Sequence, residues 1–360
     1  MNVRQRRDRL SALLDRHNLA AALYLSGENV RYLSGFTGSN GQLFLDRDRT
    51  WLLTDGRYAA QAAEQADVDE ILIYERLDEA LRKLLHEPVR TGFEAAAVTV
   101  AQWRDLTQKL PKLADAVPLP TDAVELRIAK DDDELNAITR AIQIAEEAWT
   151  SVQQAIVPGI TERELSLKLE WTIRSAGSRT VPFEFIVASG ARSAMPHGVA
   201  SDRTIEEGDP LTVDFGAEAD GYFSDMTVAG SVGRRDPWIE EIVAILEAAQ
   251  EAAFAVLEPD VPCADVDAAA RRVIEKAGYG EAFSHSLGHG VGLAIHEAPR
   301  LSRLSDQHLP VGAVVTIEPG IYVPGRGGAR IEDMVVVTSD GYRKLTSLPK
   351  SAYCWNQGDS

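Results

Sequence analysis

The sequence predicts an α+β protein that is divided into two domains. The length of 360 residues is more than one compact domain usually contains. Up to about residue 126, short apolar strands alternate with helices, as in an α/β domain. From residue 127 on, two helices are followed by paired strands and further helices. We therefore place a smaller domain at residues 1–126 and a larger one at 127–360.

The first domain is expected to contain strands and helices in turn. Apolar residues at helical spacing and alanine-rich stretches predict helices at residues 4–17, 59–66, 78–86 and 98–110. Short apolar runs predict strands at residues 20–25, 42–45, 51–54, 71–74 and 91–93. The charged turn at residues 46–49 joins two of these strands into a hairpin.

Two prolines and a charged run mark the join between the domains. They are Pro118, Pro120 and residues 130–133. An aspartate of the charged run can cap a helix that continues to about residue 155. A second helix is expected to begin after Thr161, which forms a capping box with Glu164.

The rest of the second domain is expected to contain mostly strands, with two more helices. Asp220-Gly221 is a strong turn signal and predicts a hairpin of strands 211–215 and 222–228. Helical patterns cover residues 238–257 and 265–277. Later strands are expected at residues 311–317, 331–337 and 342–345.

The composition excludes several classes of partner. With 55 acidic and 37 basic residues the net charge is −18, so we expect no nucleic-acid partner. No apolar run approaches the roughly 20 residues that span a bilayer, and residues 1–19 resemble an amphipathic helix rather than a signal peptide. Cys263 and Cys354 form no metal or disulfide pattern. We expect a cytoplasmic protein with no membrane partner.

Five residues of the second domain have metal-ligand side chains at structured spacings: Asp214, Asp225, His289, Glu318 and Glu332. Asp214 alternates with apolar neighbours, so it points to the opposite face of its strand. The hairpin turn brings Asp225 opposite Asp214 or one diagonal step away. Glu318 and Glu332 repeat this arrangement from two strands joined by a glycine-rich loop at residues 324–329. Glycines flank His289 and allow close approach.

This donor set predicts a pair of divalent cations. Four carboxylates and one imidazole suit Mn²⁺, the metal we expect, with Co²⁺ or Zn²⁺ as alternatives. Two such ions at roughly 3.5–4 Å activate a water for hydrolysis. Any one of these acids alone is more typical of a helix cap, a salt bridge or an exposed turn. His197, His285 and His296 lie in the same part of the sequence, and His197 and His296 are candidates for contacts to the reacting group.

The motifs VDFG, GYFSDMT, SHSLGHGVGLAIHEAP, TIEPGIYVPG and ARIEDMVVV resemble those of the pita-bread metallopeptidases. That superfamily includes methionine aminopeptidase, prolidase, aminopeptidase P and creatinase. The resemblance implies a pita-bread catalytic domain with a pseudo-twofold axis. It also implies that all five residues bind two metals, with Asp225 and Glu332 bridging both. Glu318 would also move the proton of the attacking hydroxide, His197 and His296 would contact the substrate, and His285 and Arg330 would lie around the site.

Motifs of the first domain indicate which members of this superfamily the sequence resembles most. YLSGFTGSNG and WLLTDGRY resemble the creatinase/prolidase-type N-terminal domain, especially that of aminopeptidase P-like proteins. The implied activity is removal of an N-terminal residue that precedes proline, by a metallo-exopeptidase acting on peptides with proline at the second position. The resemblance also implies a homodimer. The glycines of this region and Asp55-Gly56 are typical of ordinary turns, and the alternative is that this region of one subunit helps to close the site of another.

Three alternatives remain open at this point. An Xaa-Pro dipeptidase (prolidase) needs a cation for the free carboxylate of proline, for which Arg192 and Arg326 are candidates. A general N-terminal exopeptidase of the methionine aminopeptidase type would not require proline at the second position. A peptide- or protein-binding module is the alternative from another class.

Overall fold

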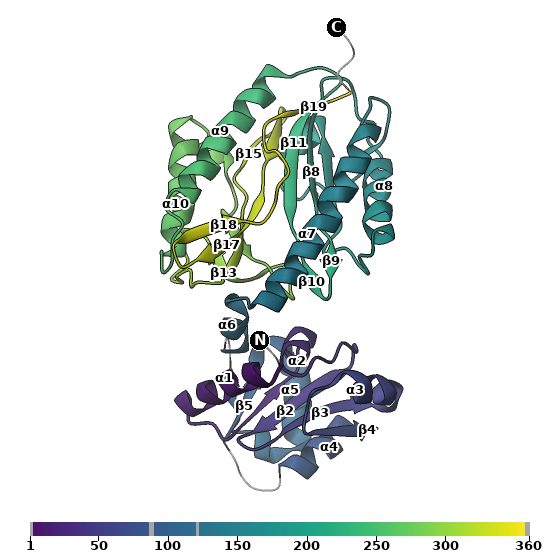
Figure 1. The fold of residues 1–360 in the computed structure, drawn as a ribbon, viewed down its shortest axis with the longest axis vertical. Coiled ribbons are helices and arrows are strands. Elements are labelled where there is room, and N and C mark those ends of the chain that lie inside the picture. Colours follow the sequence, from purple (N-terminus) through teal and green to yellow (C-terminus); the bar gives the residue numbers. More distant parts are fainter. Residues whose placement is uncertain (1–2, 86–89, 120–121, 357–360) are drawn as a thin grey trace. The chain divides into compact units, whose positions relative to one another are not determined.

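The computed structural model describes residues 3–85, 90–119 and 122–356, and the chain divides into two compact units (Figure 1). The units are Met1–Arg127 and Ile128–Ser360. Pro120 and the end of the helix expected at residues 78–86 lie outside the described residues.

The first unit is built on a six-stranded sheet with the order β4-β3-β2-β1-β5-β6. β1 is parallel to β5 and antiparallel to β2. Its apolar side chains, among them Leu23, Phe44 and Leu53, form the core of the unit. The strands are β1 (Ala21–Tyr24), β2 (Gly41–Asp46), β3 (Thr50–Asp55), β4 (Glu70–Tyr74), β5 (Thr91–Glu94) and β6 (Val117–Leu119).

Helices flank this sheet, and three of the elements, α2, α6 and β6, were not predicted. α2 has caps at both ends: Ser26 accepts a hydrogen bond from Asn29 N, and Gly35 ends the helix at a φ of 77°. β6 contains Pro118, which is tolerated because β6 is an edge strand. The helices are α1 (Val3–Arg16), α2 (Gly27–Ser34), α3 (Ala59–Gln65), α4 (Leu77–Leu84), α5 (Val100–Lys109) and α6 (Asp122–Ile128).

The second unit contains four longer helices. The expected capping box between Thr161 and Glu164 is present. Asp131 is the expected aspartate cap of α7, and it also forms a capping box with Glu134 that was not predicted. In Figure 1 α7 and α8 lie beside the sheet that contains β8 and β11, and Trp149 of α7 stacks on Phe215 of β8 at 5.2 Å. α9 and α10 pack together on the other side. The helices are α7 (Asp132–Val152), α8 (Glu162–Ser175), α9 (Pro237–Phe254) and α10 (Cys263–Lys276).

Two sheets form the centre of the second unit, with the orders β19-β11-β8-β7 and β13-β12-β14-β17-β18. The first contains β7 (Ile186–Ser189), β8 (Pro210–Phe215), β11 (Met226–Val232) and β19 (Tyr353–Trp355). The second contains β12 (Gly288–Gly290), β13 (Glu297–Leu301), β14 (Val314–Ile317), β17 (Asp333–Thr338) and β18 (Gly341–Lys344). Buried residues of α9 and α10, such as Leu246 and Val266, join Val315 and Val335 in one core.

Two small hairpins complete the second unit. β9 (Glu218–Ala219) and β10 (Tyr222–Phe223) are joined by the expected turn, in which Asp220 and Gly221 have φ values of 47° and 79°. β15 (Gly320–Val323) pairs with β16 (Gly327–Arg330), so the loop expected at residues 324–329 is in part a strand. Among the described helices, none combines the length and apolar character needed to cross a membrane.

Candidate metal centre

The two aspartates project from one antiparallel strand pair. In the register of β8 and β11, Asp214 is the partner of Thr227. Asp225 comes two residues before Thr227, immediately ahead of β11, so it occupies the diagonal position on the same face. Both aspartates are buried, with 8% of Asp214 and 4% of Asp225 exposed.

The two glutamates are placed by a second strand pair. Ile317 at the end of β14 is the partner of Asp333 at the start of β17. Glu318 directly follows β14 and Glu332 directly precedes β17, so their backbones diverge where the paired segment ends. The β15–β16 hairpin occupies the chain between them. The pair of aspartates and the pair of glutamates are therefore positioned by two separate sheets.

His289 lies in β12, where the chain approaches its neighbours closely. A Cβ at Gly288 would lie 1.9 Å from Thr316 O, and one at Gly290 would lie 2.3 Å from Ala298 O. Glycine is therefore required on both sides of the histidine. His289 Nδ1 is 3.1 Å from Gly290 O, which places the ring proton on Nδ1 and leaves the Nε2 lone pair free to bind a metal.

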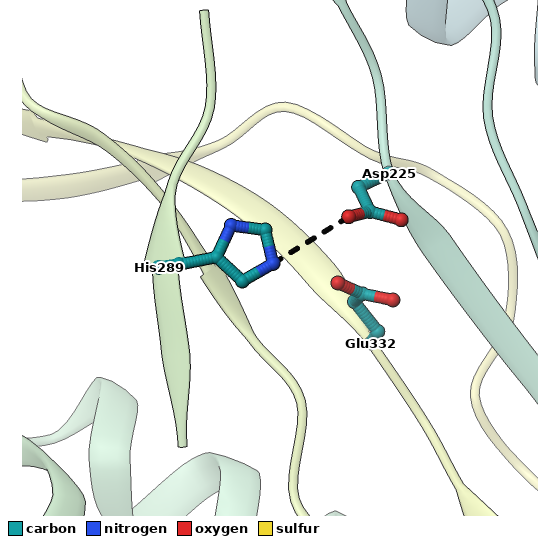
Figure 2. A group of neighbouring side chains, drawn as sticks. All are labelled: Asp225, His289 and Glu332. Atoms are coloured by element: carbon teal, nitrogen blue, oxygen red, sulfur yellow. Dashed lines mark ion pairs between the residues drawn. The ribbon is translucent and has the colours of Figure 1, made fainter. Parts of the chain in front are cut away.

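These segments bring an imidazole and three carboxylates together, and Figure 2 shows the imidazole with two of the carboxylates. His289 Nε2 is 3.6 Å from Asp225 Oδ2, the ion pair dashed in Figure 2. It is also 3.4 Å from Glu318 Oε1. Asp225, His289 and Glu332 each offer a ligand atom, and these atoms lie within 4.8 Å of one another. The side chains come from three separate strand regions, as Figure 2 shows.

Burial shifts the pKa values of these groups in the directions expected for a metal centre. Burial raises the pKa of Asp225 well above its usual value, and the charges of Glu332 and Asp214 raise it further. Burial and then the charge of Glu318 raise the pKa of Glu332 in the same way. Burial raises the pKa of Glu318 to about 8 and lowers the pKa of His289 to about 4. A neutral imidazole is the form that binds a metal.

Buried carboxylate oxygens without hydrogen-bond partners also indicate a site for divalent cations. Oδ1 of Asp214 and Oδ1 of Asp225 are both buried and have no hydrogen-bond partner among the described residues. Such oxygens are costly unless a cation or a donor compensates them. Four carboxylates crowded into one buried space require positive charge, and two divalent ions would balance them.

Arg330 supplies part of that charge and holds Asp214. Its Nη2 donates to Asp214 Oδ2, its Nε donates to Thr227 Oγ1 at 3.1 Å, and its Nη1 donates to Tyr322 OH at 2.7 Å. Tyr322 in turn donates to His285 Nε2 at 3.0 Å, and His285 Nδ1 donates to Ser286 O. Burial lowers the pKa of His285 to about 3, so the histidine in this series of hydrogen bonds is neutral.

The five proposed metal ligands and the four residues expected around them line one cavity of about 850 Å³. His296 packs against His289 with ring centroids 4.4 Å apart. Burial lowers the pKa of His296, and His197 lines the same cavity. Phe183, Ile186 and Val199 give the cavity an apolar wall. The full predicted set in this cavity is His197, Asp214, Asp225, His285, His289, His296, Glu318, Arg330 and Glu332.

Residues 136–339 match metallopeptidase family M24, and residues 6–128 match the creatinase/prolidase N-terminal domain. The chain belongs to metallopeptidase family M24. This confirms the family resemblance, the α+β fold class and the pita-bread catalytic domain.

Relatives of this M24 peptidase match over nearly their whole length. An Xaa-Pro dipeptidase of Pyrococcus furiosus is 34% identical over 353 residues, which cover 97% of this chain and 99% of the relative. The structure of an Xaa-Pro dipeptidase from Bacillus anthracis superposes with a TM-score of 0.93 at 38% identity, covering 98% of this chain and 100% of the other. An X-Pro aminopeptidase from Thermotoga maritima gives 0.89 at 35% identity, with coverages of 96% and 99%.

Several polar residues of the M24 site were not predicted, among them Thr227, Tyr322 and Arg300. Thr227 and Tyr322 form hydrogen bonds with the predicted residues, and Arg300 lines the cavity. Strand alternation was the available signal: Thr227 is two residues after Asp225, and Tyr322 lies on the strand that follows Glu318. Arg300 is the cross-strand partner of His289, which the sequence of a three-residue strand does not reveal.

The two arginines proposed from sequence are engaged elsewhere. Arg192 donates to Glu162 and to Val199 O. Arg326 stacks over the ring of Trp238, 4.1 Å from its centroid. Neither is among the described residues that line the cavity.

Proposed function

We propose that this protein is a metal-dependent Xaa-Pro dipeptidase, which hydrolyses the bond between an N-terminal residue and a C-terminal proline. The observation that carries the hydrolytic part is the buried group of four carboxylates and His289 around one cavity, with an oxygen of Asp214 and one of Asp225 left without a hydrogen-bond partner in the described structure. The names of the Pyrococcus and Bacillus relatives support the dipeptide part.

In this proposal Asp214, Asp225, His289, Glu318 and Glu332 would hold two divalent ions. When bound, the ions polarise the scissile carbonyl and lower the pKa of a water molecule to about 7. Mn²⁺ is the metal we propose, because oxygen donors outnumber nitrogen in the set.

The side chains around the ions supply proton transfer and positioning. Burial raises the pKa of Glu318 to about 8, and Glu318 lines the cavity, so this carboxyl is placed to move the proton of the attacking water. His296 and His197 line the same cavity as the carboxylates and can donate to the developing oxyanion or to the leaving nitrogen. The prolyl amide has no N–H, so recognition depends on these groups and on the apolar wall.

Arg300 is the group we propose for the carboxylate of the C-terminal proline. It is opposite His289 in the β12–β13 pair, so it is on the face that carries the proposed metal ligand. Within the described residues, its guanidinium has one hydrogen bond, from Nε to Ser286 Oγ at 3.3 Å. Arg330, the other arginine of the cavity, already uses three of its nitrogens. Arg300 therefore has donors left for a substrate anion.

An Xaa-Pro aminopeptidase is the second candidate, and it is the function that the N-terminal motifs favoured. The Thermotoga structure named as an X-Pro aminopeptidase supports it, at 35% identity over nearly the whole chain. The dipeptidase is favoured over it because two of the three relatives named above are dipeptidases and because Arg300 is available.

A substrate-length series tests the proposal. Purified protein is loaded with Mn²⁺, Co²⁺ or Zn²⁺ in turn and given Ala-Pro, Ala-Pro-Ala-Ala and Ala-Ala. We expect fast turnover of Ala-Pro alone, and fastest with Mn²⁺. Faster turnover of the tetrapeptide would establish the aminopeptidase, and turnover of Ala-Ala would indicate a general exopeptidase. Absence of stoichiometric metal binding would favour a binding module. Light scattering in solution tests the homodimer that we also propose.

A further inference from the structure

One buried carboxylate outside the metal centre has an unusually complete set of donors. Glu162 is the first residue of α8, and none of its side chain is exposed. Oε1 accepts from Ser189 N and Ser189 Oγ, both at 2.8 Å. Oε2 accepts from Ser201 N at 3.0 Å and from Ser201 Oγ at 2.6 Å. Arg192 Nη1 also donates to Oε2. Each oxygen therefore receives at least one backbone N–H.

These donors are the two ends of one loop. Ser189 ends β7, and the chain from there to Ser201 contains the short helix Gly190–Ala194 and then His197. Arg192 lies inside the loop and donates to Val199 O as well as to Glu162. The Glu162 carboxylate thus closes the loop at its base, where both ends meet, and binds it once more in its interior.

The far side of the same loop is fixed to the metal centre. Arg330 Nη1 donates to Pro196 O at 3.1 Å, directly before His197. Gly328 N donates to Ser193 Oγ at 2.9 Å. A Cβ at Gly198 would lie 2.9 Å from Ala188 Cβ, so the residue after His197 packs tightly against β7. His197 is exposed, but the backbone on both sides of it is held.

We propose that Glu162 is a positioning residue for catalysis, which holds the loop of residues 189–201 so that His197 faces the metal centre. The inference rests on the proposed function, because it needs His197 to act on the substrate. Arg330 fixes the loop at the tip and Glu162 fixes it at the base, and the two together leave the His197 backbone one conformation. A histidine on a short, doubly anchored loop is ready for the substrate and needs no ordering when the substrate binds.

Glutamine is the informative replacement for Glu162 because it keeps the size of the side chain. A hydroxyl can turn its proton away from an amide NH₂, but the N–H groups of Ser189 and Ser201 cannot turn. One of the two must then face the NH₂ of the introduced glutamine with no acceptor. One end of the loop is released, while α8 and its capping box, made by Thr161 and Glu164, remain.

The experiment is a double-mutant cycle on the metal-loaded full-length protein with Ala-Pro as substrate. Glu162→Gln, His197→Ala and the double variant are compared with the wild type. Glu164→Gln, an exposed acid of the same helix turn, is the matched control. Metal content and the melting temperature are measured for every variant. Hydrogen exchange at the amides of Ser189 and Ser201 reports loop closure without depending on activity.

We expect Glu162→Gln to lower kcat by about 10- to 100-fold, as a displacement of about 1 Å does at a catalytic group, with metal content unchanged. The same change made on top of His197→Ala should cost less than about twofold, because the group it positions is already absent. Exchange should speed up at Ser189 or Ser201 in Glu162→Gln but not in Glu164→Gln. If Glu162→Gln does not fold, Ser201→Ala removes one hydroxyl donor and should give the same non-additivity with a smaller loss.

Two results would overturn the inference. One is a Glu162→Gln enzyme with wild-type kcat. The other is a loss that is fully additive with that of His197→Ala, since Glu162 then acts through something else. In both cases an active wild-type enzyme leaves the proposed function standing. A wild-type protein that does not hydrolyse Ala-Pro counts against the proposed function itself, whatever the exchange data show.

Discussion

The hydroxyl of Thr227 donates a 2.7 Å hydrogen bond to Oε2 of Glu332. The same two residues are joined through the backbone, where Glu332 N donates to Thr227 O at 3.1 Å. These bonds connect the strand that follows Asp225 with the strand that follows Glu332, so they tie the two acid pairs together. They also occupy one oxygen of Glu332 and fix the direction of the carboxylate.

Thr227→Val should therefore weaken metal binding without removing a ligand. Valine has the shape of threonine but no donor, so Glu332 loses its orienting bond and Arg330 Nε loses an acceptor. We expect the affinity for Mn²⁺ to fall by about 10- to 100-fold in a titration of the metal-free protein. Thr227→Ser keeps the hydroxyl and serves as the control. Equal affinities in the valine variant and the wild type would show that the bond does not orient the ligand.

Asp225→Asn or Glu332→Gln should abolish both activity and bound metal while the fold persists. Burial and neighbouring carboxylates raise the pKa of each residue, so neutralising one relieves repulsion in the metal-free protein. Metal analysis and circular dichroism check the two halves of this prediction. Retained turnover in either variant would count heavily against its role as a metal ligand.

His296→Ala should lower turnover more than metal content. The ring lies 4.4 Å from the His289 ring and lines the cavity, but it is not one of the five proposed metal ligands. We expect kcat to fall by about 100-fold or more, the usual contribution of a general acid or an oxyanion donor. Loss of metal in proportion to activity would reassign His296 as a ligand.

The pH dependence of stability should have opposite signs with and without metal. Burial raises the pKa of Glu318 from 4.5 to about 8, so the folded, metal-free protein holds this proton more tightly than the unfolded chain does. That stabilisation is complete below about pH 4.5 and is lost as the pH rises through about 8. Metal binding requires the deprotonated group, so added Mn²⁺ should stabilise the protein more as the pH rises. Melting curves between pH 5 and 8, with chelator or with Mn²⁺, test both signs. A melting temperature that does not change with pH in the presence of chelator would contradict the prediction for the metal-free protein.

The acid pairs were predictable because their geometry is local. Asp214 and Asp225 are brought together by strand alternation and by the Asp220-Gly221 turn, all within one short stretch of sequence. Capping boxes at α7 and α8 are local for the same reason. These features depend on the order of residues and hardly on the rest of the fold.

The unpredicted parts depend on contacts between distant segments. β12 contains only Gly288, His289 and Gly290, and it is a strand because it lies between β13 and β14. β19 is a three-residue strand that pairs in parallel with β11. No propensity in such short segments indicates a strand. The role of Arg192 was unpredictable in the same way, because its partner Glu162 precedes it by a helix and a strand.

Arg300 should decide how strongly the enzyme prefers dipeptides. The register of β12 and β13 places it opposite His289, and its charge contributes to lowering the pKa of Glu318 against the effect of burial, so it lies near the proposed reaction centre. In an Ala-Pro substrate the proline carboxylate is free, whereas in Ala-Pro-Ala-Ala it is an amide. Only the dipeptide can form a charge-assisted hydrogen bond with Arg300.

Arg300→Met should therefore lower kcat/KM for Ala-Pro by about 10- to 100-fold, the cost of a lost bond between charged groups, and leave the tetrapeptide nearly unaffected. Arg300→Lys keeps the charge but not the paired donors, so its loss should be intermediate. Arg303→Met, a change at an exposed arginine that follows the same strand, is the control for altered surface charge. An equal loss of kcat/KM for both substrates would mean that Arg300 shapes the site without binding the proline carboxylate. The preference for dipeptides would then have to come from closure of the cavity beyond the proline.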